Sequence, residues 1–141
     1  MNLIKPKNVS CTKQSLLSTL WIFVLFNYLY CDVLSNMEAE TLNGLLTGHI
    51  AGMEITPFFM LGAAILMEIP TLMVLLSRIL PHKGNRRANI IAGLIMTSVQ
   101  TGSLFVGTGP SLHYVFYSAI EITCTAVIIW LAWRWPDPEI A

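Results

Sequence analysis

Long runs of apolar residues alternate with short polar segments along the whole chain. Four runs are long enough to cross a hydrocarbon core, which takes about 20 residues of helix. They lie at Ser15–Leu34, Thr56–Leu80, Ala88–Phe105 and Leu112–Trp133. Every backbone polar group in lipid needs a partner within the protein, so such runs form helices rather than isolated strands. The pattern predicts an all-α fold, a bundle of four transmembrane helices.

The connections between these runs differ in character. The first, Ser35–Ile55, is long for a helical bundle, and its apolar residues recur at helical spacing. We expect a short amphipathic helix there, lying on or dipping into the outer interface. In the second, Pro81 cannot continue a helix and Gly84-Asn85 favours a reversal, which predicts a turn over residues 81–87. The third is a turn near Gly107–Pro110.

Composition agrees with a membrane protein. The 141 residues are 55% hydrophobic and only 11% charged, with a mean hydropathy of +0.65, whereas a soluble domain carries about 25% charged residues. A chain this short has too little interior to hide so much apolar surface. We expect a single membrane domain over residues 1–141, with the lipid bilayer as its partner. The net charge of zero and the lack of a basic stripe exclude nucleic-acid binding.

The basic residues predict the topology. They gather before the first run, around the second connection and after the fourth run, and they are Lys5, Lys7, Lys13, Arg78, Lys83, Arg86, Arg87 and Arg134. With four spans these places fall on one side, which the positive-inside rule assigns to the cytoplasm. Both termini are then cytoplasmic. The first run is longer than a signal-peptide core and no cleavage site follows it, which predicts a retained helix.

Acidic residues lie within the apolar runs. At about 1.5 Å per residue, Glu68 lies roughly 18 Å inside the outer end of its run and Glu121 roughly 15 Å inside its own. Both are therefore near the midplane, where an ionisable group should face the bundle interior. Asp32 lies near the outer end of the first run. Such acids can hold and release a proton, or receive an organic cation.

Other polar residues share helix faces with these acids. We expect an interior pocket, open to the outside, lined by Asn27, Tyr30, Glu68, Gln100, Tyr117 and Glu121. Pro70 leaves the carbonyl of Leu66 unpaired and is expected to bend the helix, turning Glu68 toward Glu121. Interhelical hydrogen bonding without chemistry is the alternative for the neutral polar residues, and a structural role stays open for the acids.

No spacing in the sequence predicts a metal or cofactor. His49, His82 and His113 are scattered. Cys11, Cys31 and Cys124 form no Cys-x-x-Cys pair and are expected to be ordinary buried thiols.

Three stretches together resemble a known family: "STLWIFVLFNYLYCDVLS", "EIPTLMVLLSRILPHKGNRRANIIAG" and "YVFYSAIEITCTAVIIWLAWRWP". The specific positions are Tyr30–Asp32, Ile69-Pro70, Asn85-Arg86 with Asn89, Glu121-Ile122, Trp130, Ala132-Trp133 and Trp135-Pro136. They resemble an uncharacterised family of small bacterial four-helix membrane proteins, a domain of unknown function. The family has tryptophan where this chain has Arg87, and apolar residues at the Glu68 position in some members, which favours Glu121 and Asp32 as site residues.

The resemblance implies a multi-pass protein of the bacterial inner (plasma) membrane and supplies no activity. Three functions remain open. The first is binding or transport of a small molecule with proton coupling through the two mid-membrane acids, for which a homodimer is expected because four helices are few for a pathway. The second is a membrane-embedded enzyme acting on a lipid-like substrate, with the acids as general acid and base. The third is an accessory subunit without chemistry.

Overall fold

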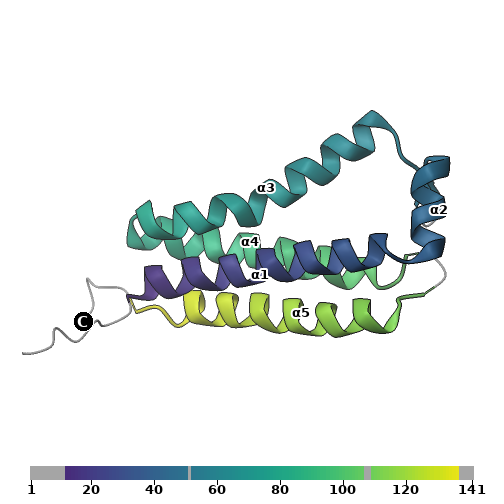
Figure 1. The fold of residues 1–141 in the computed structure, drawn as a ribbon. Helices are drawn as coiled ribbons and strands as arrows, with labels where there is room; N and C mark the ends of the chain where they lie inside the picture. Colours follow the sequence, from purple (N-terminus) through teal and green to yellow (C-terminus); the bar gives the residue numbers. More distant parts are fainter. Residues whose placement is uncertain (1–11, 51, 107–108, 137–141) are drawn as a thin grey trace, which may run out of the picture.

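The computed structural model describes residues 12–50, 52–106 and 109–136, and this part of the chain is helical apart from one small hairpin (Figure 1). Its elements are α1 Lys13–Asn36, α2 Ala39–Thr47, β1 His49–Ile50, β2 Met53–Glu54, α3 Pro57–Ile79, α4 His82–Ser103 and α5 Leu112–Trp133. Four helices are long and one is short, as the apolar pattern predicts. The sequence expectations for Lys5, Lys7, Cys11, Gly107 and Thr108 lie outside the described residues.

Three helices, α1, α3 and α5, are long and apolar enough to cross a membrane. The helix α4 does not meet that description, although it is 22 residues long. Its first turns hold Lys83, Arg86 and Arg87, and its interior holds Asn89 and Gln100. By length and composition the described residues therefore contain three such helices, and not the four expected, because polar side chains are spread along all of α4.

Side-chain caps set the starts of two of the apolar helices. The hydroxyl of Thr12 accepts a hydrogen bond from the backbone N–H of Ser15 at 3.2 Å, and that of Thr56 accepts one from Phe59 at 3.1 Å. Each bond satisfies an N–H that has no partner within the helix. The fixed backbone angle of Pro57 suits the first position of α3. The observed starts, at residues 13 and 57, lie close to the predicted ones.

The predicted turn over residues 81–87 is wrong. The backbone carbonyl of Pro81 accepts from the N–H of Asn85 at 2.8 Å, so Pro81 is the N-cap of α4 and the helix begins at His82. Pro81 still ends α3, because the residue before a proline is driven into the extended conformation seen at Leu80. Gly84 and Asn85 are thus helical, and α4 begins six residues before the predicted Ala88.

At the opposite end of the bundle, α2 lies across the ends of the long helices (Figure 1). Gly48 ends it in a left-handed conformation, with φ 77°, which glycine adopts without strain. The hairpin of β1 and β2 follows and leads into α3. The short helix expected in this connection is present. No residue of α2 is fully buried, and Thr41, Gly44 and Leu45 form a half-buried face.

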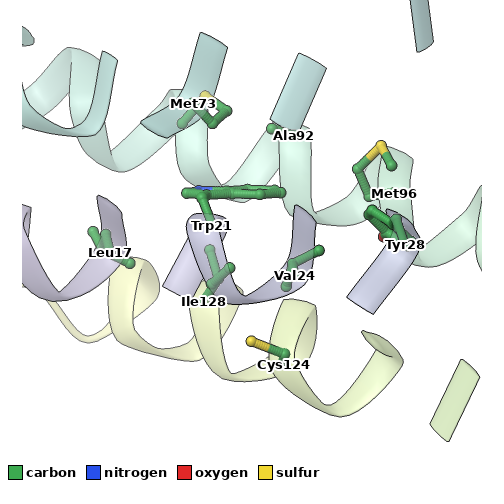
Figure 2. Packing of buried hydrophobic residues seen from close by; sticks show 9 residues of the cluster. All are labelled: Leu17, Trp21, Val24, Tyr28, Met73, Ala92, Met96, Cys124 and Ile128. Carbon is green, nitrogen blue, oxygen red and sulfur yellow. The ribbon is translucent and has the colours of Figure 1, made fainter. Parts of the chain in front are cut away.

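The apolar core lies where α1 faces the other three long helices (Figure 2). Trp21 is fully buried at its centre. Its neighbours in the cluster are Leu17, Val24 and Tyr28 of α1, Met73 of α3, Ala92 and Met96 of α4, and Cys124 and Ile128 of α5. Cys31 and Cys124 are buried free thiols, as expected. The core residues of α1 are spaced by four and three, so they form one continuous stripe along the helix.

A buried polar network joins α1, α3 and α4 near the α3–α4 turn. The side-chain oxygen of Asn89 accepts from the Trp21 indole N–H at 2.7 Å and from the Ser77 hydroxyl at 3.3 Å. Its amide N–H₂ donates to the side-chain oxygen of Asn85 at 2.7 Å, and Asn85 donates to the Ser77 carbonyl at 2.6 Å. Asn89 therefore satisfies buried groups on two other helices.

The N-terminal half of α3 leaves the bundle. Figure 1 shows α3 rising away from α1 toward the α2 end. The buried residues of α3 are Pro70, Met73 and Ser77, all in its C-terminal half, whereas residues 57–65 are exposed. Pro70 lies at the start of the packed half. The missing hydrogen bond to the Leu66 carbonyl explains why the helix can diverge on that side.

Candidate functional site

A ladder of side-chain hydrogen bonds joins α4 to α5. The Tyr114 hydroxyl donates to Ser103 Oγ at 2.7 Å, and Gln100 Nε2 donates to Ser118 Oγ at 2.7 Å. Thr97 and Thr125 share a bond of 2.7 Å between their hydroxyls. The partners on α5 in these three bonds, Tyr114, Ser118 and Thr125, form one polar stripe along that helix, at spacings of four and seven residues. The three are interhelical bonds of the kind expected from the structural alternative.

Glu121 belongs to the same stripe, but its side chain makes no hydrogen bond to α4 in the described part of the chain. It lies between Ser118 and Thr125 in sequence and is 0% exposed. Neither carboxyl oxygen has a hydrogen-bond partner within the described part of the chain. Its burial was expected from the sequence. A buried polar atom without a partner is rare enough in a folded protein to need an explanation.

The surroundings of Glu121 come mainly from α1. Its carboxyl lies within electrostatic range of Tyr28, Cys31 and Asp32 on α1 and of Tyr114 on its own helix. The Tyr28 hydroxyl is also buried without a partner among residues 12–50, 52–106 and 109–136. Two unsatisfied polar groups, an acid and a phenol, therefore occupy the same interior region.

A cavity opens beside this region, between α1 and α3. Its volume is about 390 Å³, and its lining consists of Ile22, Leu25, Phe26, Tyr28, Leu29, Asp32 and Met67. The walls are apolar except for Tyr28 and Asp32. These two residues are also within electrostatic range of Glu121. The apolar cavity therefore shares two polar residues with the electrostatic surroundings of the buried carboxyl.

The other residues expected to line an interior pocket are not gathered there. Asn27 is buried but donates to the Phe23 carbonyl of its own helix at 2.8 Å. Tyr30 is 57% exposed. The side-chain amide of Gln100 donates to Ser118. Tyr117 is half-buried and packs its ring edge-on against that of Phe116, with the ring centroids 5.6 Å apart. The prediction that these residues share interior helix faces was correct in part. Asn27, Gln100 and Tyr117, however, contact nearer residues, and Tyr30 faces outward.

The expected meeting of Glu68 and Glu121 does not occur. Glu68 is exposed on α3, whereas Glu121 is fully buried on α5. The packed side of α3 carries Pro70, Met73 and Ser77. The bend at Pro70 thus moves the N-terminal half of α3 away from the bundle and does not turn Glu68 inward.

Tyr28 is the site residue that the sequence expectations missed. Its signal was available, because Trp21, Val24, Tyr28 and Cys31 repeat at spacings of three and four and so mark the buried face of α1. Asn27 and Tyr30, which were expected in its place, flank that face. The buried stripe of α1 was the better guide to which polar group meets Glu121.

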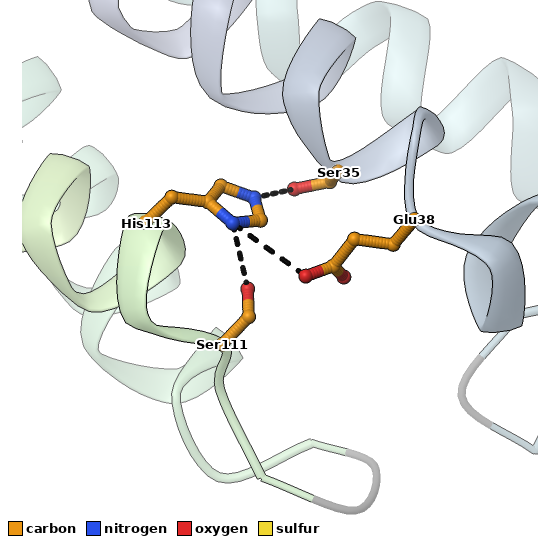
Figure 3. A network of polar contacts seen from close by, with 4 residues as sticks. All are labelled: Ser35, Glu38, Ser111 and His113. Carbon is orange, nitrogen blue, oxygen red and sulfur yellow. Dashed lines mark hydrogen bonds and ion pairs between the residues drawn. The ribbon is translucent and has the colours of Figure 1, made fainter.

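A second polar cluster closes the bundle at the α2 end (Figure 3). His113 Nε2 lies 3.2 Å from Ser35 Oγ, and His113 Nδ1 lies 3.2 Å from Ser111 Oγ and 3.5 Å from Glu38 Oε1. These contacts tie the start of α5 to the end of α1. In the part of the chain that the structure describes, no group of three or more metal-ligating side chains is present.

The surface is basic at the end of the bundle where α3 turns into α4. A cavity of about 450 Å³ is lined by His82, Lys83, Arg86, Arg87, Ile90 and Trp133. Arg134 lies over the ring of Trp130, 5.2 Å from its centroid. The described basic side chains thus gather at one end of the bundle, and aromatic residues accompany them.

Comparison with known proteins adds a family without a function. A model described as a family of unknown function, DUF6326, matches residues 5–141. Neither a curated protein nor a solved structure matches the chain.

Proposed function

The chain belongs to the family of unknown function DUF6326, and because that family brings no activity with it, we propose a function from the geometry. The protein is a membrane-embedded binding bundle that takes up an amphipathic organic cation between α1 and α3 and exchanges it for a proton on Glu121. The observation that carries the proposal is the fully buried carboxyl of Glu121, whose two oxygens have no partner in the described residues.

A charge on the buried carboxyl of Glu121 needs a compensating positive charge. A carboxylate without a hydrogen bond or counter-charge is very unfavourable in a low-dielectric interior. Every lysine and arginine of the described chain lies toward the helix ends at the α3–α4 turn, so none can pair with Glu121. The charge must be compensated by a bound proton or by a cationic ligand, and these two exclude one another at the same oxygens.

The cavity between α1 and α3 suits the ligand's apolar body. Five of its lining residues are aliphatic, thioether or phenyl side chains. Asp32 is a negative group at the wall, and the rings of Phe26 and Tyr28 attract cations through their faces. Tyr28 lines the cavity and lies within electrostatic range of Glu121, so in this function a movement of its side chain would let the hydroxyl donate to the carboxylate once the proton has left.

We also infer that α4 crosses the membrane with the other three long helices. Its polar residues Asn85, Asn89 and Gln100 are buried against its neighbours. Its exposed side consists largely of aliphatic residues, Ile91, Leu94, Ile95 and Val99. A helix with polar residues inside and apolar residues outside suits lipid despite its modest overall hydropathy. The positive-inside rule then places the α3–α4 turn and both termini in the cytoplasm of a bacterium.

Binding is tested on purified protein in nanodiscs with tetraphenylphosphonium as the probe cation. We expect saturable binding, with release of a proton that a pH dye detects in weak buffer. Glu121→Gln removes the exchangeable charge and should weaken binding by about tenfold or more, which is about 1.4 kcal/mol. Glu68→Gln is the matched control, because Glu68 is exposed and outside the cavity; its affinity should equal that of the wild type.

Three results would contradict this function. The first is the absence of saturable binding to the wild type. The second is equal affinity in Glu121→Gln, and the third is equal affinity for an uncharged analogue of the probe. Either of the last two would make the cavity a purely apolar site.

Topology is tested by cysteine labelling in a variant without the natural cysteines. An impermeant reagent added outside intact cells should label Glu40→Cys and Pro110→Cys and should miss Lys83→Cys. Pro110 decides the role of α4, because it lies on the cytoplasmic side if α4 fails to cross. Labelling of Lys83→Cys alone would reverse the orientation.

A further inference from the structure

The outward face of α3 carries a regular stripe of exposed residues. Its members are Phe58, Leu61, Ile65, Glu68, Leu72, Leu75 and Ile79, and they alternate at spacings of three and four. The apolar members are between 46% and 85% exposed. This is the seven-residue repeat with which helices pack along one another in a left-handed crossing.

Glu68 is the exception in this stripe. It lies at the middle of α3, about 16 Å from either helix end at about 1.5 Å per residue. Its short side chain therefore cannot reach the membrane–water interface. Acidic residues within spanning helices almost always face protein or water, because hydrocarbon offers no hydrogen bond. Glu68 has no hydrogen bond or ion pair to any residue in the described ranges, and its neighbours α1 and α4 pack on the other side of α3.

The exposed faces of the other long helices do not carry a charged residue at mid-length in the described part of the chain. The exposed residues in the middle of α1, α4 and α5 include no acidic or basic side chain among those described, and Asp32 lies near the end of α1. Among the described residues, contact with lipid is therefore most unfavourable at Glu68, in the middle of α3. Whatever covers the stripe must be apolar along its length and must offer a hydrogen-bonding group opposite Glu68.

We propose that a second copy of the chain covers this stripe, in a parallel homodimer in which the two Glu68 side chains meet on the twofold axis. Copies that insert in the topology proposed above share one orientation, so each residue faces its own counterpart. Each protonated carboxyl donates its O–H to the carbonyl oxygen of the other. Phe58, Leu61, Ile65, Leu72, Leu75 and Ile79 then pack against the same residues of the partner. The interface uses neither Glu121 nor the Tyr28 side of the cavity.

Cross-linking tests the contact in bilayers. In a variant whose natural cysteines are alanine, Ile65→Cys and Leu72→Cys flank Glu68 on the stripe and should form covalent dimers under mild oxidation. Phe26→Cys is the matched control, since it is an exposed residue near the middle of α1 and should stay monomeric. Equal cross-linking at all three positions, or none at Ile65 and Leu72, would overturn the proposal.

Energy transfer between fluorophores fused to the N-terminus tests the role of the acid without removing cysteines. Dilution of the protein in lipid gives the dimer dissociation constant. Glu68→Leu keeps an apolar stripe but loses the hydrogen bonds, and it should weaken the dimer about tenfold. Glu68→Gln still donates and accepts, and should stay near the wild-type value. A wild type that remains monomeric at high protein density, or a Glu68→Leu variant that dimerises as well as the wild type, would show that Glu68 does not hold two copies together.

Discussion

Replacing Asn89 with leucine is expected to lower the free energy of unfolding by about 3 kcal/mol, since orphaning a buried polar group costs about 1–3 kcal/mol and more than one is orphaned. Asn89 accepts from Trp21 and Ser77 and donates to Asn85. The leucine fills the space, but the Trp21 indole N–H and the Asn85 side-chain oxygen lose their partners where no water reaches them. SDS titration in mixed micelles, followed by circular dichroism, measures the loss.

The matched control is Ser98→Leu. Ser98 lies on the same helix, is exposed, and has no hydrogen bond through its side chain to the described residues. Its replacement should change stability by less than about 0.5 kcal/mol, as surface substitutions usually do. Equal losses in the two variants would mean that the network near the α3–α4 turn contributes little.

A double substitution separates the lost hydrogen bonds from the lost shape. Trp21→Phe alone removes one donor to Asn89. Combined with Asn89→Leu it removes both partners of that bond, so no indole N–H is left unpaired. The double variant should therefore lose less than the sum of the two single variants, by about 1 kcal/mol. Strict additivity would show that Trp21 and Asn89 are not energetically coupled.

The sequence predicted the helices better than their connections. The apolar runs placed α1, α3 and α5 within two residues of their observed bounds. The start of α4 was missed because "PHKGNRR" contains the residues of a turn. A hydropathy pattern does not reveal a helix end that consists of basic residues. A proline that ends one helix can also be the N-cap of the next.

The sequence predicted where the two acids lie along their helices, but not the direction in which their side chains face. It placed Glu68 and Glu121 near the middle of α3 and α5, and it indicated their helix faces only relative to residues on the same helix. The rotation of a helix about its axis depends on which neighbours it packs against. Pro70 and Met73, on another side of α3 from Glu68, proved to be the packed residues. Tyr28 was missed although its stripe can be read from the sequence, because only the contacts of α1 with three other helices show that this stripe is the buried one.

The second large effect concerns Gly93, where α4 packs tightly against α5. A Cβ atom built on Gly93 would lie 2.6 Å from Cγ1 of Ile129 and 3.5 Å from the carbonyl oxygen of Thr125. Small residues let helices in lipid pack at short distance, where dispersion and interhelical hydrogen bonds are strongest. Thr97, one turn along α4, makes its 2.7 Å bond to Thr125 because the helices are held at this distance.

Gly93→Ala should therefore lower the free energy of unfolding by about 1–3 kcal/mol, the usual range for overpacking a well-packed site. The sign is opposite to that of helix propensity, which favours alanine over glycine by about 1 kcal/mol. Gly102→Ala isolates that propensity, since its methyl group would have no described atom within 4 Å apart from its chain neighbours and the adjacent backbone of α4, and it should be neutral or stabilising. Ile129→Ala removes the obstructing Cγ1, so adding it to Gly93→Ala should cost less than the two changes apart. SDS titration of the four variants measures these differences. A Gly93→Ala protein as stable as Gly102→Ala would mean that α5 yields freely at Ile129, and that close helix contact does not hold Thr97 against Thr125 beside the buried carboxyl of Glu121.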